Sequence, residues 1–94
     1  MNLREYKDAS NRLSIDLSSS DSVVLFHKFS YRLSNLYKAV VTERLEGAEQ
    51  RYWDFDVAGT TVVLHSDSMA GISIHVKDGS NDALLRRIAA DLIK

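Results

Sequence analysis

Apolar and polar residues alternate along several short segments of the chain, and this period of two is typical of half-buried β-strands. Leu13, Ile15 and Leu17 point to one side of the first such segment. Similar alternation runs through residues 52–57, 61–65 and 72–77. We expect a further strand at residues 39–47, although no glycine or proline separates it from the segment before it.

Two other segments have the period of an amphipathic helix, with apolar residues three and four positions apart. The first runs over residues 21–38, after serine and aspartate residues that favour a helix N-cap. The second follows a capping cluster at residues 80–82 and continues to the end of the chain. The apolar stripe of the first helix consists of Phe26, Phe29, Leu33, Leu36 and Tyr37, and that of the second of Leu84, Leu85, Ile88, Leu92 and Ile93.

The predicted order of elements is therefore β-α-β-β-β-β-α. The three short connections between residues 39 and 77 favour an antiparallel meander. Each helix has one apolar stripe and the sheet has one apolar face, so the helices should cover that face. We expect an α+β fold, a two-layer sandwich with a mostly antiparallel sheet and both helices on one face. The chain should form a single domain over residues 1–94, with residues 1–10 loosely ordered, and the place of the first strand in the sheet stays open.

Composition narrows the range of functions. Twelve basic and 13 acidic residues give a net charge of −1, which provides no general attraction to nucleic acid. The chain has no cysteine, so it can form neither a disulfide nor a thiolate zinc site. It also lacks a phosphate-binding glycine loop and an apolar run of the ~20 residues that cross a bilayer. We expect a cytoplasmic protein with no cofactor, no nucleic-acid partner and no membrane partner.

Polar residues on the outward side of the meander form the one candidate site for chemistry. If Gly59 and Thr60 are the residues of the first hairpin turn, Asp54 lies opposite His65. Across the turn at residues 66–71 we expect His65 to lie opposite His75. Directly opposed residues have Cβ atoms ~5 Å apart, so these registers predict a row of one carboxylate and two imidazoles across three strands.

This row has two interpretations. Two imidazoles and a carboxylate suit a transition metal with an open position, and a metal-dependent enzyme would follow. The alternative, which we prefer, is the solvent-facing side of a sheet, because the spacing matches no metal-binding motif such as HExxH. Asp54 and Asp56 also lie ~7 Å apart on one strand face, although alternating acids on an exposed face are common. We therefore predict no metal site and no enzymatic activity.

Aromatic residues on the third predicted strand allow two orientations. Trp53 should face the core beside Phe55, whereas an inverted register would expose both rings as an interface. Tyr52 should lie on the outer face with Asp54 and Asp56. A tyrosine beside carboxylates is suited to docking a basic protein partner.

The segment YWDFDVAGTTVVLHSDSMAGISIHV, with Trp53, Gly59, Leu64 and His65, is similar to a family of small bacterial proteins of unknown function. In size and architecture the chain also resembles the small bacterial immunity proteins of contact-dependent growth inhibition and related toxin systems. This resemblance implies a stoichiometric inhibitor that binds a cognate toxin domain. A nuclease toxin would have a basic cleft, for which acidic side chains are complementary. The candidate partner-binding residues are Glu43, Glu46, Glu49, Tyr52, Asp54 and Asp56.

Two alternatives stay open beside an immunity protein. One is a homodimeric structural or interaction module that pairs through an exposed strand edge. The other is the metal-dependent enzyme that uses Asp54, His65 and His75. For the immunity protein, we expect that reversing the charges of Asp54 and Asp56 together weakens partner binding and leaves the fold intact.

Overall fold

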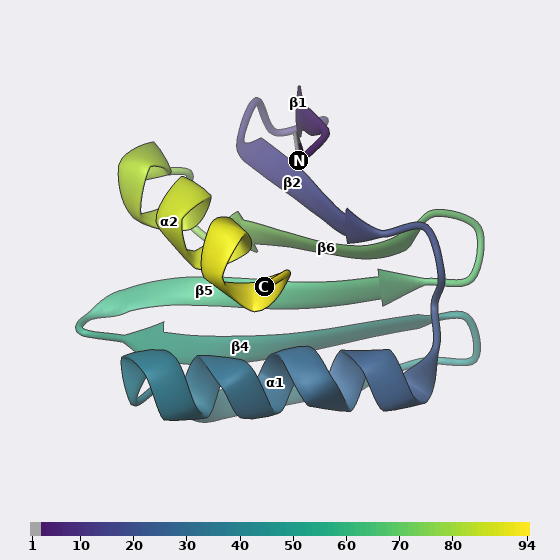
Figure 1. Ribbon diagram of the computed structural model, residues 1–94. Helices are drawn as coiled ribbons and strands as arrows, with labels where there is room; N and C mark the ends of the chain where they lie inside the picture. The colour runs from purple at the N-terminus through teal and green to yellow at the C-terminus, as the bar shows by residue number, and fades with distance from the viewer. Residues whose placement is uncertain (1–2) are drawn as a thin grey trace.

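The alternating segments form one antiparallel sheet, and the two helices cover one of its faces (Figure 1). This arrangement, seen in a computed structural model that describes residues 3–94, confirms the predicted α+β sandwich. The elements are β1 (Glu5–Lys7), β2 (Leu13–Ser18), α1 (Val23–Tyr37), β3 (Val40–Glu46), β4 (Gln50–Val57), β5 (Thr60–Asp67), β6 (Gly71–Val76) and α2 (Asp82–Leu92).

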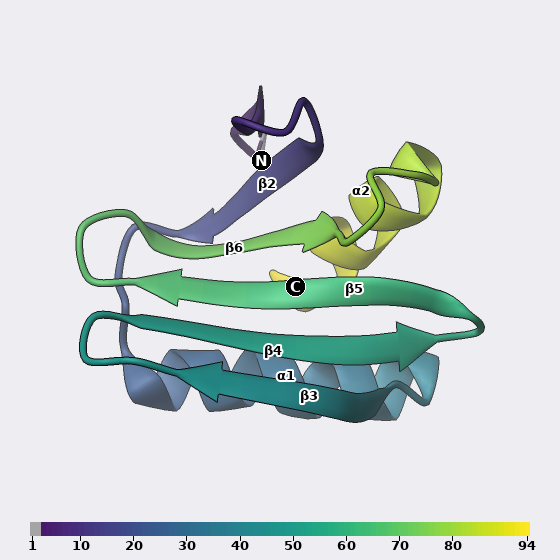
Figure 2. The same ribbon diagram turned by 180° about the vertical axis from the view of Figure 1, so that it is seen from behind.

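The strand order in the six-stranded sheet is β1-β2-β6-β5-β4-β3. Strands β3 to β6 form the expected meander. Figure 2 shows it from the face of the sheet that the helices do not cover. The first predicted strand, β2, pairs antiparallel with β6 at the far end of this meander. Because α1 connects β2 to β3, the chain crosses over three intervening strands in a single step.

The N-terminal segment contains a strand that the sequence does not predict. Residues 5–7 form β1 and pair with β2, with Tyr6 opposite Ser14. The carboxylate of Asp8 closes the turn between them, since its Oδ1 accepts hydrogen bonds from the backbone N–H groups of Ser10 and Arg12 at 2.9 and 3.0 Å. The expectation of a loosely ordered segment at residues 1–10 rested on its polar composition and terminal position. Its first two residues lie outside the described chain.

The helices bury most of their predicted stripes. Phe26, Phe29 and Leu33 of α1 are buried, whereas Leu36 remains 57% exposed, contrary to the prediction. The helix ends at Lys38, which adopts a left-handed conformation with φ of 53°. This residue performs the turn that a glycine usually makes at a helix end, and β3 can therefore begin two residues later. Helix α2 buries Leu85, Ile88, Ala89 and Leu92.

The core lies between the helices and the inner face of the sheet. Trp53, at 8% exposure, faces this core as predicted, and its ring lies edge-on to that of Phe26 at 5.1 Å. Gly71 begins β6 where β2 passes closest, with a φ of +90°. A Cβ atom at Gly71 would lie 2.7 Å from the backbone carbonyl carbon of Ser19, so only glycine fits this junction. No helix among the described residues is long and apolar enough to cross a membrane.

Candidate functional site

The outer face of the sheet does not contain the predicted row of Asp54, His65 and His75. The hairpin turn consists of Ala58 and Gly59, so Val57 pairs with Thr60. The register is therefore shifted, and Asp54 lies opposite Val63. This error arose because Ala58 adopts a positive φ of 50°, a conformation that alanine seldom takes.

The two histidines keep the predicted face, because a shift by two residues preserves the side on which a residue lies. His65 pairs with Tyr52 on one side and Ser73 on the other, while His75 lies between Val63 and Ser14. Within residues 3–94 there is no cluster of three His, Cys, Asp or Glu side chains that could hold a metal ion. The ligand set that the sequence suggested is thus not assembled.

The histidines instead line a partly covered hollow of about 230 Å³ beneath the β1–β2 hairpin. The ring of His65 stacks on Tyr52 with centroids 4.1 Å apart, and its buried Nε2 has no hydrogen-bond partner. Burial lowers the pKa of His65. His75 is 8% exposed, and burial, aided by the charge of Arg12, lowers its pKa to about 4. Both shifts favour the neutral imidazole, and the charged groups of this hollow are the ion-paired Asp8 and Arg12.

Asp54 is buried and already paired. Its side chain is 11% exposed, and its Oδ2 accepts a hydrogen bond from Lys77 Nζ at 2.7 Å. Lys77 Nζ also lies 3.8 Å from a carboxylate oxygen of Glu43. A charge reversal at Asp54 would place a cation at a buried position beside the ammonium group of Lys77, and it should therefore destabilise the fold. The sequence led us to expect that the charges of Asp54 and Asp56 can both be reversed without loss of the fold. For Asp54 we now expect the charge reversal to destabilise the fold.

The six candidate partner-binding residues do not form one patch. Glu43, Tyr52, Asp54 and Asp56 share the outer face. Glu46 points to the opposite face, where its Oε1 accepts from Arg51 Nε at 3.0 Å and from Trp53 Nε1 at 3.1 Å.

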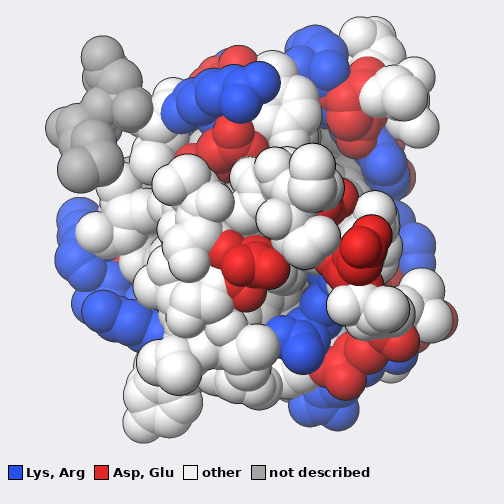
Figure 3. Space-filling view, turned by 90° about the vertical axis from the view of Figure 1, so that its right-hand side faces the viewer, with Lys and Arg blue, Asp and Glu red and all other residues white. Residues whose placement is uncertain are grey.

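Glu49 lies outside the strands, in the turn between β3 and β4. This turn and the one between β5 and β6 lie at the end of the sheet that Figure 3 faces. Acidic and basic side chains are interspersed on that side (Figure 3).

What the acidic candidates do share is their position on or beside β3, the strand at one edge of the sheet. Six of its seven residues are exposed, and Val41 is half-buried. Val40 and Leu45 are 61% and 59% exposed, so two large aliphatic side chains lie on an edge that has a neighbour only on one side. A bulge between Val41 and Glu43 interrupts the pairing with β4. The exposure of Val40 and Leu45 was not predicted, because an apolar run in the sequence does not show which strand lies at an edge of the sheet.

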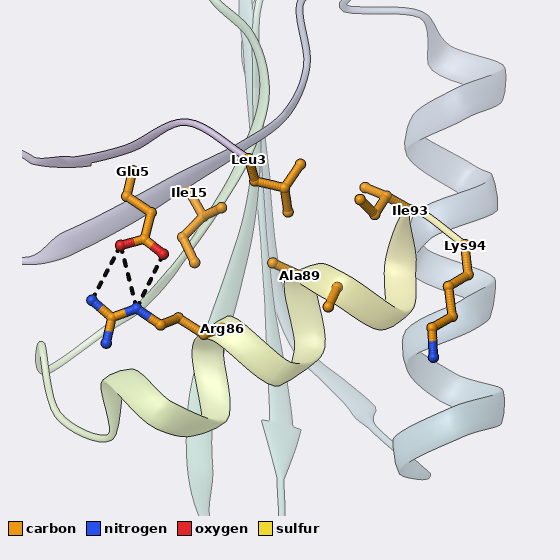
Figure 4. Close-up of a pocket in the computed structure, with 8 residues that line it drawn as sticks. Leu3, Glu5, Ile15, Arg86, Ala89, Ile93 and Lys94 are labelled. Atoms are coloured by element: carbon orange, nitrogen blue, oxygen red, sulfur yellow. Dashed lines mark hydrogen bonds and ion pairs between the residues drawn. The ribbon is translucent and has the colours of Figure 1, made fainter. Parts of the chain in front are cut away.

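The opposite edge strand, β1, is held against α2 (Figure 4). Arg86 donates from Nε and Nη2 to the carboxylate of Glu5, at 3.0 and 3.1 Å. Leu3, Ile15, Ala89 and Ile93 line an apolar hollow of about 520 Å³ beside this ion pair. The two edges therefore differ in their cover, and β3 is the one that is accessible along its length.

Comparisons with known proteins found no matching family model, no curated protein and no solved structure with significant similarity.

Proposed function

We propose that the protein is a non-enzymatic binding module that engages a protein partner through β3 and the adjoining outer face. In its most specific form it is a cytoplasmic immunity protein that neutralises a cognate bacterial toxin domain, as the sequence resemblance implies. The observation that carries the proposal is the exposure of β3 at the edge of the sheet, where six of its seven residues are exposed.

An edge strand offers backbone N–H and C=O groups to an added strand, and the side chains beside it provide specificity. Val40 and Leu45 both lie on the outer side of β3, opposite Asp56 and Tyr52 of β4. A partner strand beside β3 would cover these exposed aliphatic side chains. The bulge at Thr42 limits regular pairing to the segment from Glu43 to Glu46.

Charge favours a basic partner at this edge. Glu43 and Asp56 are exposed on the outer face, and Glu49 is exposed at the end of the hairpin. Asp54 does not add to this attraction, because it is buried and its ion pair with Lys77 places a cation beside Glu43. Complementary charge increases the association rate and the discrimination between partners, which suits a toxin whose substrate cleft is basic.

The proposal is tested by isolating the tagged protein from its native host and comparing two variants. Val40→Lys/Leu45→Lys places cations on the edge strand, and Met69→Lys alters an aliphatic side chain that is 90% exposed in the β5–β6 turn. A toxin-like domain recovered in a one-to-one complex by wild type and Met69→Lys, and lost by the edge variant, would support the proposal. Recovery of the same partner by the edge variant would refute the β3 assignment.

A homodimer is the second candidate function, because the same exposed edge of β3 could pair with its copy across a two-fold axis. Light scattering of wild type and Val40→Lys/Leu45→Lys at equal concentration distinguishes the two. A dimeric wild type that becomes monomeric in the edge variant would favour the homodimer over the toxin inhibitor.

A further inference from the structure

The helical face of the molecule contains a groove between α1 and α2. The two helices lie close together at the C-terminal end of α2 and diverge toward its N-terminal end (Figure 1). Arg32 of α1 holds the close end, since its Nη1 donates to the carbonyl oxygen of Leu92 at 3.0 Å. The groove has a volume of about 760 Å³ and is lined by side chains of both helices. It is separate from β3 and from the outer face of the sheet.

The α1 wall of this groove carries apolar side chains that the core does not use. Tyr31 is 69% exposed and Leu36 is 57% exposed, and both line the groove. Leu36 belongs to the apolar stripe that the sequence predicts for the core, but the sheet and α2 do not reach it. Large apolar side chains gathered on a concave surface are typical of an interaction site.

The charge of the groove is positive although the chain as a whole is slightly acidic. Lys28, Arg32, Arg87 and Lys94 line it together with one acid, Asp91. The carboxylate of Asp91 is occupied, because it accepts a hydrogen bond from the Tyr37 hydroxyl and lies 3.3 Å from Lys94 Nζ. None of the ion pairs found within residues 3–94 uses Lys28 or Arg87. These two cations are therefore available from opposite walls of the groove.

We propose that this groove binds an acidic amphipathic helix of a protein partner. The apolar side of such a helix would cover Tyr31 and Leu36, and its flanking carboxylates would meet Lys28 and Arg87. A helix suits the site because two diverging helices form a channel into which a third can pack, with axes ~8–10 Å apart. A partner strand would gain nothing here, since the backbone groups of α1 and α2 are paired within the helices. The surface is distinct from the β3 edge, and its charge is opposite.

The test uses a fluorescein-labelled amphipathic peptide that can form a helix. Its apolar face, which would enter the groove, consists of leucine, and the positions on either side of that face are glutamate. Its comparison peptide has lysine in place of each glutamate. Anisotropy titrations with the full chain should give a dissociation constant on the order of 10 µM for the acidic peptide and much weaker binding for the basic one. Lys28→Glu/Arg87→Glu should weaken binding of the acidic peptide by at least about tenfold, since repulsion replaces attraction on both walls.

Two further variants separate docking from general charge effects. Arg4→Glu/Lys7→Glu makes the same change in net charge at and beside β1, where both side chains are more than half exposed, and should bind the acidic peptide as wild type does. Tyr31→Ser/Leu36→Ser keeps every charge and should also weaken binding, because it removes the apolar contact. Circular dichroism and thermal unfolding of each variant establish that it is folded.

Several outcomes would overturn the proposal. These are absence of saturable binding up to ~1 mM peptide, equal affinity for both peptides, and wild-type affinity in Lys28→Glu/Arg87→Glu or in Tyr31→Ser/Leu36→Ser. Tighter binding of single-stranded oligothymidine that is lost in the same variants would assign the groove to nucleic acid instead. Val40→Lys/Leu45→Lys should leave peptide affinity unchanged, so failure at the groove and failure at the β3 edge are distinguishable.

Discussion

The two edges of the sheet differ in almost every property that controls access. At one edge, β1 has three residues, and its Glu5 is held by Arg86 of α2. At the other edge, β3 has seven residues, most of them exposed. Two of its exposed side chains, those of Val40 and Leu45, are aliphatic. Natural sheets commonly shorten or cover an edge to prevent unwanted pairing. The protein does this at β1, whereas at β3 it uses only a bulge and charges, and β3 is therefore the edge that we propose for partner binding.

The largest expected effect on stability comes from a substitution at Gly71, where β6 meets the end of β2. Gly71→Ala should lower the free energy of unfolding by on the order of 3–5 kcal/mol, because its Cβ would press on the backbone of Ser19 and force β2 away from β6. Chemical denaturation measures this. Gly59→Ala is the matched control, since it has a similar φ of +89° but no atom within 4 Å of the added Cβ. It should cost only about 1–2 kcal/mol; equal losses would mean that the junction is not tightly packed.

Acidification should weaken the same side of the sheet through His75, whose neighbour on β2 is Ser14. The folded chain keeps His75 neutral down to its pKa of about 4, whereas the unfolded chain binds the proton near the ordinary pKa of 6.5. The unfolded state therefore binds more protons between these values, and stability is lost as pH falls from about 6.5 to about 4. The shift corresponds to about 3 kcal/mol.

Replacement of His75 by glutamine isolates this contribution from the carboxylates that titrate in the same range. Denaturation of wild type and His75→Gln at several pH values should show a stability difference that shrinks on acidification. The charges nearest His75 are those of Arg12, Asp8 and Asp54, with His65 beside them, and they are unchanged in this variant. Parallel stability curves from pH 7 to pH 4 would show that burial of His75 does not control its protonation.

Near the exposed edge of the sheet, the ion pair of Lys77 with Asp54 stabilises β4, the strand that pairs with β3. Lys77→Met should lower the free energy of unfolding more than loss of an exposed ion pair does, because it leaves the buried carboxylate of Asp54 without its cation. Glu43→Gln is the control, since Glu43 is exposed and lies farther from Lys77, at 3.8 Å. Thermal unfolding compares them. A loss as large in the control as in Lys77→Met would show that Lys77 acts through Glu43 and not through Asp54.

The smallest effect is expected from the ion pair that covers β1. Glu5→Gln should lower the free energy of unfolding only slightly, because both partners are partly exposed and screened by solvent. Hydrogen exchange should nevertheless become faster at the amides of β1 and not at those of β3. Unchanged exchange at β1 would show that α2 covers this edge by packing alone.

The periodicity of the sequence was sufficient for the helices, the meander and the single covered face. It could not locate β2, because alternation shows that a residue faces the core but not which strand lies beside it. The histidine row failed at both hairpins. The positive φ of Ala58, which sets the first register, has no sequence signal in alanine, and in the second hairpin His65 pairs with Ser73 instead of His75. For Leu36 the helical periodicity was correct, but periodicity does not show that this position lines the groove between the two helices and stays exposed.

The position of β2 beside β6 also has a kinetic consequence. Strands β3 to β6 pair with their immediate neighbours in the chain, so they can associate early at low loop-closure cost. Ile15 of β2 must wait for Ile74 of β6, which leaves the ribosome much later. During synthesis β2 can pair with β1, but its other side stays without a partner strand until β6 has emerged. Unpaired apolar strands of this kind are prone to aggregation, and the yield of folded protein should be limited by docking of β2.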